Sequence, residues 1–150
     1  MAQRSVLISG ADGFLGRALT ATFAVAGWRV FGLIRGLSTK SPPAELSGAF
    51  DYSFPDRIDP LAFDVPLDLF IHNAFQTRTA ATAHSKENVD AARFLLDRFG
   101  RRRNCRFAFV SSMSAHGNAH SCYGVDKLTI ERLLDPERDL AIRPLTSVSE

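Results

Sequence analysis

Residues 5–16 read SVLISGADGFLG, an apolar run followed at once by three glycines spaced three residues apart. The run Ser5–Ser9 is typical of a strand that is buried on both faces, and it stops at Gly10. From Phe14 onward, apolar residues recur at helical spacing until Gly27, a residue type that commonly ends helices. The stretch therefore predicts a strand, a tight glycine turn and an amphipathic helix, which together begin a βαβ unit.

The same alternation of strands and helices continues along the chain. Further strands are expected at 28–34, 50–54, 67–72, 106–110 and 140–143, and helices at 14–26, about 80–99 and 122–134, with about two helical turns within 55–63. This alternation predicts a single α/β domain over residues 1–150, with a doubly wound, mostly parallel sheet and helices on both faces. The expected fold is Rossmann-like, with about six strands.

The composition excludes several classes of protein. With 150 residues, 45% of them hydrophobic and 23% charged, the chain is long enough to bury a core without disulfide or metal support. It shows no apolar run of membrane-spanning length and no signal peptide before the first strand. Two cysteines, Cys105 and Cys122, are too few for a disulfide framework, so we expect a cytoplasmic protein. A net charge of +2 predicts no nucleic-acid or membrane partner.

Histidine spacing and the charge run add no further site. The four histidines show no tight metal-ligand spacing, so no metal site is expected, although His116 or His120 can face a substrate. The run 101–103 is all arginine and follows the long helix, where cations stabilise the helix dipole and face solvent. The phenylalanines on strands and their flanks are interpreted as core residues: Phe54, Phe63, Phe70, Phe75, Phe107 and Phe109.

The glycine turn is a candidate phosphate site. In open parallel sheets, ligands bind beyond the carboxyl ends of the strands. Glycines there let the backbone approach a pyrophosphate, and the following helix offers unpaired N–H groups and positive dipole character. We therefore expect a dinucleotide to bind this turn, and the alternative is a tight turn without a ligand. The expected contacts are Gly10, Asp12, Gly13, Phe14, Leu15 and Gly16.

The end of the second strand bears on which dinucleotide binds. An acidic residue there would hold the ribose 2′-hydroxyl of NAD, whereas an arginine suits the 2′-phosphate of NADP. The strand ends in Ile34, and Arg35 follows without any acid. This favours NADP over NAD, and the alternative is that Arg35 is an ordinary solvated arginine.

Tyr123 and Lys127 are four residues apart and therefore share one face of a helix. A serine-rich segment, Ser111–Ser114, follows the expected strand at 106–110, at the same edge of the sheet. Tyrosine can act as an acid or base near neutral pH when a neighbouring ammonium group stabilises its phenolate. A serine hydroxyl can orient a substrate oxygen. The arrangement fits redox chemistry at a carbonyl or alcohol, and the alternative is a pair on a solvated helix face.

These motifs, in this order, resemble the extended short-chain dehydrogenase/reductase family, also called NAD-dependent epimerases/dehydratases. The resemblance covers nearly the whole chain through VLISGADGFLGRAL, LDLFIHNAF, ENV, FVSSMSAHG, YGVDK and AIRP. It implies that His72-Asn73-Ala74, with Phe75, lies along the cofactor beside Ser111. It also implies that the exit of the last strand, at Pro144 and Leu145, contacts the nicotinamide.

The resemblance assigns four further roles. Ser112 would position the substrate oxygen, Tyr123 would donate or accept the proton, and Lys127 would stabilise the phenolate and hold the nicotinamide ribose. Asn88 would support this active site. The substrate class would be a nucleotide-linked sugar or a related hydroxy-carbonyl compound, with epimerase and reductase outcomes both open.

The chain also departs from the family. Dehydration is not expected, because Met113 and Ser114 stand where the dehydratase branch carries an Asp-Glu pair. As a separate departure, His116-Gly117 stands where the family commonly has Tyr-Gly. The family continues for well over a hundred residues beyond the last strand, and that part forms most of the substrate domain. One alternative is therefore a non-catalytic or truncated dinucleotide-binding module. Another is a homo-oligomer or partner chain that completes the sheet at its unpaired edge.

Overall fold

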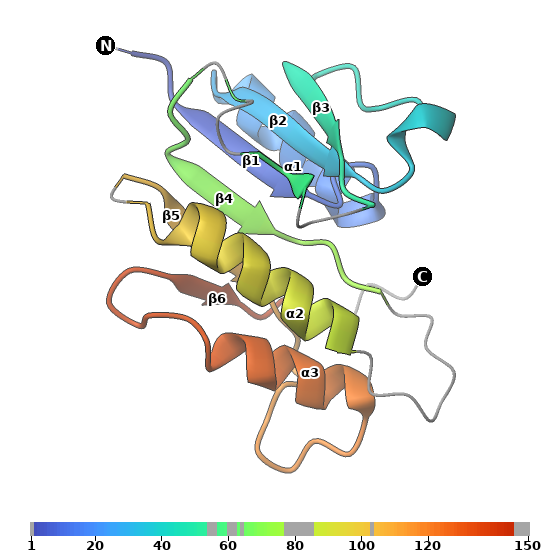
Figure 1. Cartoon of the computed structure of the whole chain (residues 1–150), viewed down its shortest axis with the longest axis vertical. Coiled ribbons are helices and arrows are strands. Elements are labelled where there is room, and N and C mark those ends of the chain that lie inside the picture. The colour runs from blue at the N-terminus through green and yellow to red at the C-terminus, as the bar shows by residue number, and fades with distance from the viewer. Residues whose placement is uncertain are drawn as a thin grey trace.

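The computed structural model describes residues 2–53, 57–59, 63, 65–76, 86–102 and 104–145. They contain a six-stranded sheet in which every pair of neighbours is parallel, with the order β3-β2-β1-β4-β5-β6. Figure 1 shows the strands side by side in this order. The order runs outward in both directions from β1, so the predicted doubly wound, Rossmann-like fold is confirmed.

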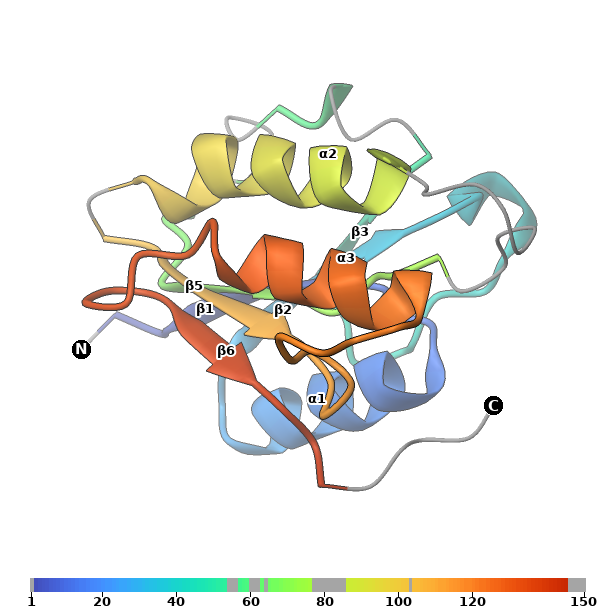
Figure 2. The ribbon, with the colours of Figure 1, turned by 90° about the horizontal axis from the view of Figure 1, so that it is seen from below.

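The bounds of the elements lie close to those predicted. In chain order they are β1 (Ser5–Ser9), α1 (Phe14–Val25), β2 (Arg29–Ile34), the short 3₁₀ helix η1 (Leu37–Thr39), β3 (Gly48–Asp51), β4 (Leu69–His72), α2 (Lys86–Leu95), the π-helical turn η4 (Leu96–Gly100), β5 (Arg106–Val110), α3 (Cys122–Glu131) and β6 (Leu140–Ile142). Helix α1 covers one face of the sheet, and α2 and α3 cover the other (Figure 2). Within the described residues, no helix is long and apolar enough to cross a membrane.

The predicted bounds of several elements differ from the structure. The strand expected at 67–72 begins at Leu69, and the helix expected at 122–134 ends at Glu131. The third strand begins at Gly48 and not at residue 50, because it follows the parallel register of β2, with Phe31 opposite Gly48. The long helix ends in a π-helical turn, and a Cβ at Gly100 would lie 2.6 Å from a Leu96 methyl carbon and 3.1 Å from the Cβ of Phe107 on the neighbouring strand β5. Glycine therefore lets this last turn press against β5. Residues 80–85 and most of 54–62 lie outside the described residues, so the helical turns expected there are not assessed.

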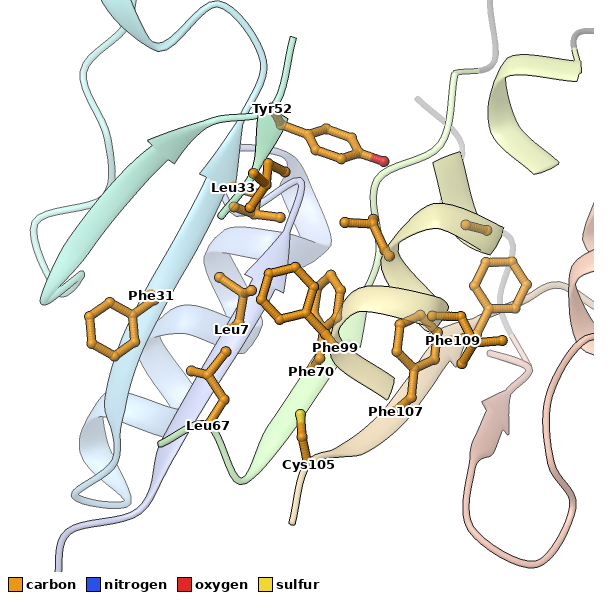
Figure 3. Packing of buried hydrophobic residues seen from close by; sticks show 14 of the residues in the cluster. Leu7, Phe31, Leu33, Tyr52, Leu67, Phe70, Phe99, Cys105, Phe107 and Phe109 are labelled. Carbon is orange, nitrogen blue, oxygen red and sulfur yellow. The ribbon is translucent and has the colours of Figure 1, made fainter. Parts of the chain in front are cut away.

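Aromatic side chains fill the face of the sheet beneath α2 and α3. Phe70 packs edge-to-face against Phe99 and Phe107, with ring centroids 5.3 and 5.1 Å apart (Figure 3). Phe107 and Phe109 are buried as predicted, whereas Phe75 is only half-buried and faces the pocket described below. Such aromatic pairs each add about 0.5–1.5 kcal/mol beyond the area they bury. The core therefore holds the central strands rigidly, and with them the loops at their carboxyl ends.

Strand β6 forms one edge of the sheet. The side chains of Leu140 and Ile142 are 57% and 40% exposed. The strand is attached to α3 by Arg143, whose Nε and Nη2 donate to the two Glu131 carboxylate oxygens at 2.8 and 2.5 Å. This arginine holds the pKa of Glu131 below its usual value. The described strands therefore leave the expected unpaired edge at β6.

Candidate functional site

A pocket of about 800 Å³ opens at the carboxyl ends of the strands. It lies where the strand order reverses beside β1, the position at which such sheets bind ligands. In the described part of the chain, seven segments line it, one at the end of each strand and one from α3: Gly10, Asp12, Gly13, Phe14, Leu15, Arg35, Tyr52, Asn73, Ala74, Phe75, Val110, Ser111, Ser112, Met113, Ser114, Tyr123, Lys127, Pro144 and Leu145.

The structure brings the predicted site residues to this pocket, except Gly16 and Asn88. Tyr52, Val110, Met113 and Ser114 line it too, and sequence reasoning missed them as site residues. Tyr52 directly follows β3, so the carboxyl-end rule would have found it had that strand been placed correctly. His116 and His120 are exposed and do not line the pocket. In the described part of the chain, no group of three potential ligands forms a metal site.

The glycine turn has the backbone geometry that a phosphate site needs. Gly10 has φ +68°, and a Cβ there would lie 3.1 Å from the Ala74 Cα. Gly13 is the N-cap residue that precedes α1 and has no side chain to cap it, so the first N–H groups of the helix have no side-chain acceptor from the cap. Phe14 and Leu15, at this helix end, line the pocket. These features fit the pyrophosphate of a dinucleotide.

Gly16 plays a different part from the other two glycines. A Cβ at this position would lie 1.9 Å from the Gly10 carbonyl oxygen and 2.8 Å from the Ala11 Cα. Gly16 is buried and does not line the pocket. It therefore acts by letting α1 pack directly against the end of β1, which places the helix end at the pocket.

Among the residues that the structure describes, Asp12 is the only acidic one that lines the pocket. A carboxylate at the start of α1 would repel a bound pyrophosphate. Lys40, which follows η1, neutralises this charge, because its Nζ lies 2.8 Å from an Asp12 carboxylate oxygen. The ion pair leaves the glycine turn without net negative charge.

A buried hydrogen-bond network fixes the segment that follows β4. The Ser9 Oγ accepts hydrogen bonds from the backbone N–H groups of Asn73 and Ala74, both at 3.0 Å. Its own proton is then donated to His72 Nδ1 at 2.8 Å, which leaves the ring proton on Nε2. Burial, with a smaller effect from the charge of Lys127, lowers the pKa of His72 to about 3. His72 is thus neutral and buried in the sheet, and only Asn73 and Ala74 of this motif line the pocket.

Lys127 is enclosed by aromatic rings beside Tyr123. Its Nζ donates to the Val110 carbonyl oxygen at 2.6 Å and lies 4.2 Å from the centroid of Phe75 and 5.4 Å from that of Tyr123. Phe75 also packs edge-to-face on Tyr123, with ring centroids 5.1 Å apart. Burial lowers the pKa of Lys127 to about 8. The cation thus stands next to the tyrosine ring at the pocket wall.

The buried Lys127 should make the stability of the protein depend on pH. Between pH 8 and the ordinary lysine value of 10.5, the unfolded chain keeps a proton that the folded chain has lost. Lys127 should therefore raise the free energy of unfolding with pH across this range, by up to about 3 kcal/mol, whereas Cys105, whose pKa burial raises to about 11, should lower it above pH 9. Urea unfolding at pH 7–9 measures the net rise, of about 1 kcal/mol, which Lys127→Met should remove and Lys40→Met should retain. If the free energy of unfolding rises equally in Lys127→Met, the pH dependence does not come from Lys127.

Two serines that follow β5 stand at the same wall. The Ser112 Oγ accepts a hydrogen bond from the Ser114 backbone N–H at 3.1 Å, so its proton remains available to a ligand. Ser111 is buried, and its hydroxyl makes no hydrogen bond of good geometry with a described residue. It lies close enough to Glu131 to help lower the pKa of that carboxylate. A bound ligand would therefore contact the Ser112 hydroxyl, whereas the Ser111 hydroxyl is buried behind the pocket wall.

Asn88 lies outside the pocket and acts on the backbone. Its Oδ1 accepts from the Gln76 N–H at 2.8 Å, and its Nδ2 donates to the Gln76 carbonyl oxygen at 3.0 Å. The Gln76 side chain in turn accepts a hydrogen bond from Arg35 at 3.1 Å. Asn88 is 8% exposed, so it supports the pocket from behind. Sequence reasoning missed Gln76, because no local pattern marks it.

A comparison with family models matched residues 6–139 to the NAD dependent epimerase/dehydratase family. A comparison with curated proteins found no match. Among solved structures, UDP-glucose 4-epimerase from Brucella ovis in complex with NAD is similar, with 22% identity and a TM-score of 0.71 over 93% of this chain and 51% of that one. MoeE5 in complex with UDP-glucose and NAD has 22% identity and a TM-score of 0.70 over 93% and 53%.

A third similar structure carries the other dinucleotide. It is described as a short-chain dehydrogenase/reductase from Burkholderia multivorans with bound NADP, and it has 21% identity and a TM-score of 0.65 over 88% of this chain and 71% of that one. At these identities the likeness concerns the fold. The chain spans about half the length of the first structures it matches, with shares of 48%, 53% and 51%.

Proposed function

Because this chain belongs to the NAD dependent epimerase/dehydratase family, we propose that it binds a nicotinamide dinucleotide, NADP(H) in preference to NAD(H). We further propose that it serves hydride transfer at a carbonyl or secondary alcohol of a nucleotide-sugar-like substrate. The observation that carries this proposal is that one pocket gathers the glycine turn, Arg35, Ser112 and the Tyr123-Lys127 pair. UDP-glucose in a similar structure supports the substrate class.

Three residues of the pocket wall, Tyr123, Ser112 and Lys127, would each have a separate role in the proton transfer. Tyr123 would give a proton to the substrate oxygen, or take one from it, because this residue lines the pocket and is partly exposed. Ser112 would donate its free proton to the same oxygen and orient it. Lys127 would stabilise the phenolate and hold the nicotinamide ribose. When bound, the nicotinamide supplies or accepts the hydride.

The preference for NADP(H) rests on the end of β2. No acid follows that strand, and Arg35 lines the pocket there. A guanidinium can hold a 2′-phosphate with two parallel hydrogen bonds. The glycine turn and the open end of α1 would take the pyrophosphate, and Pro144 and Leu145 would contact the nicotinamide.

Calorimetric titration of the purified chain with NADP⁺ and, separately, NAD⁺ tests the cofactor proposal. We expect micromolar binding with NADP⁺ preferred at least about tenfold, since a charge-assisted hydrogen bond contributes roughly 1.5–3 kcal/mol. Arg35→Met should remove most of that preference and leave NAD⁺ binding unchanged. A preference for NAD⁺ would refute the role of Arg35. Absence of binding in a chain that is folded by circular dichroism would refute the dinucleotide site.

A non-catalytic or truncated dinucleotide-binding module is the second candidate. It fits the observation that the chain spans about half the length of the structures it matches. Such a module would bind the dinucleotide and turn over nothing in a panel of nucleotide sugars and simple carbonyls. The catalytic proposal requires turnover of at least one of them.

Two further parts of the proposal concern the surroundings of the protein. The exposed edge of β6 supports pairing with a second copy or a partner chain, and the solution mass of the purified chain tests this. Cys105 and Cys122 are both free thiols, which supports a location in the reducing cytoplasm.

A further inference from the structure

Gln76 directly follows the pocket residues of the β4 exit, and its backbone is held at two points. Asn88 on α2 accepts from its N–H at 2.8 Å and donates to its carbonyl oxygen at 3.0 Å. A side-chain amide is well suited to this task, because it carries a donor and an acceptor side by side. The buried Asn88 therefore fixes the point from which the Gln76 side chain extends.

The Gln76 side chain reaches a residue on the other side of β1. Its Oε1 accepts a hydrogen bond from Arg35 Nη1 at 3.1 Å. Arg35 follows β2 and Gln76 follows β4, and β1 lies between these two strands in the sheet (Figure 1). The hydrogen bond thus connects the two sides of the switch point, where the glycine turn also lies.

This contact occupies only part of the guanidinium. Of its five N–H groups, one binds Gln76, and Arg35 makes no other hydrogen bond within the described residues. The edge formed by Nε and Nη2 remains available, and this pair of donors suits two oxygens of a phosphate.

No described residue forms an ion pair that compensates the charge of Arg35. Gln76 is neutral, and Asp12 is already paired with Lys40. Asp51, at the end of β3, accepts a hydrogen bond from the backbone N–H of Ser53 at 2.6 Å. None of these groups forms an ion pair with Arg35 in the described structure.

We propose that Gln76 is a specificity-determining residue, which holds Arg35 at the pocket with its charge intact so that the guanidinium binds the 2′-phosphate of NADP(H). Asn88 is then a positioning residue that acts through Gln76. This inference rests on the proposed function, in which Arg35 selects NADP(H). It adds that a neutral acceptor at position 76 is required for that selection.

Gln76→Glu is the sharpest test, because it keeps the shape of the side chain and adds one negative charge. The new carboxylate would pair with Arg35 and repel a 2′-phosphate. In calorimetric titrations, NADP⁺ affinity should fall at least about tenfold, the effect of roughly 1.4 kcal/mol, while NAD⁺ affinity changes by less than about threefold. Gln76→Met, which removes the amide without adding a charge, should lower the NADP⁺ preference less than Gln76→Glu does.

Two controls separate this effect from a general one. Gln3→Glu makes the same change at the only other glutamine of the chain. Gln3 precedes β1, at the amino ends of the strands and far from the pocket, and donates to the Gly27 carbonyl oxygen. This variant should leave the ratio of the two affinities unchanged. When Arg35 is present, Gln76→Glu and Asn88→Ala should each lower the ratio of NADP⁺ affinity to NAD⁺ affinity. In an Arg35→Met background, neither change should alter that ratio.

The outcomes distinguish this inference from the proposed function. If the unmodified chain prefers NADP⁺ and Gln76→Glu keeps that preference, the inference is overturned and the proposed function stands. An equal loss of both affinities also overturns it, since it shows a structural effect only. If the unmodified chain binds neither dinucleotide, or prefers NAD⁺, the NADP(H) proposal fails, and the inference fails with it.

Discussion

The Gly16→Ala variant is expected to lose about 3 kcal/mol or more of its free energy of unfolding, the cost of a severe overlap in a packed interior. The added Cβ would lie 1.9 Å from the Gly10 carbonyl oxygen, a backbone atom that cannot rotate away. Alanine normally stabilises a helix by about 1 kcal/mol relative to glycine, so the expected sign is the reverse of the helix propensity. Urea unfolding followed by far-ultraviolet circular dichroism measures the loss.

Gly13→Ala is the matched control in the same turn. A Cβ there would lie 3.4 Å from the Gly10 carbonyl oxygen, an ordinary contact, and the φ of Gly13 is −75°. We therefore expect this variant to fold with nearly unchanged stability and to lose dinucleotide affinity, because Gly13 lines the pocket. Equal stability of the two variants would show that α1 does not depend on this close approach.

Tyr123→Phe is expected to lower turnover at least about a hundredfold, the typical contribution of a general acid or base. The change removes only the hydroxyl and keeps the ring that packs edge-to-face on Phe75. NADP⁺ affinity should therefore stay within about threefold of that of the unmodified chain, a difference of less than about 0.7 kcal/mol. Steady-state rates with the best substrate from a panel of nucleotide sugars and simple carbonyls, together with calorimetry, measure both effects.

Tyr52→Phe makes the same change at the only other tyrosine. Tyr52 also lines the pocket, but it follows β3, away from the serines and Lys127, and burial raises its pKa. We expect this variant to retain turnover within about tenfold of the unmodified chain, since it removes no proposed acid or base. Full turnover in Tyr123→Phe would remove that residue from the chemistry. Loss in both variants would indicate a general disturbance of the pocket.

The local sequence carried enough information to predict the fold and most of the pocket. The apolar run Ser5–Ser9, the glycine turn and the helical periodicity after it are short-range patterns, and each depends on residues only a few positions apart. In a parallel sheet, the carboxyl ends of all strands lie at one edge, so predicting the strands also predicts which segments meet. For this reason the sequence predicts Arg35 and the serine segment after β5 at one site, while the choice of Ser112, Tyr123 and Lys127 as its acting residues comes from their spacing and from the family resemblance.

Other parts of the site depend on contacts between distant residues. Arg35 and Gln76 are 41 residues apart, and Asp12 and Lys40 are 28 apart. Their meeting depends on the order of the strands and on the exact path of the loops, which periodicity does not encode. The start of β3 likewise follows its register with β2, and a shift of two residues leaves the hydrophobic pattern of a strand unchanged.

Asn88 and Phe75 show which features follow from the local sequence and which follow only from the tertiary structure. The sequence by itself determined the fold class, the phosphate turn and the identities of the residues at the carboxyl edge, because propensity, periodicity and glycine geometry are local properties. Only the tertiary structure decided that Asn88 holds the backbone of Gln76 and that Phe75 lies over Lys127 at the pocket wall. Side-chain direction and burial there result from packing between α2, α3 and the sheet, which forms only when the whole chain has folded.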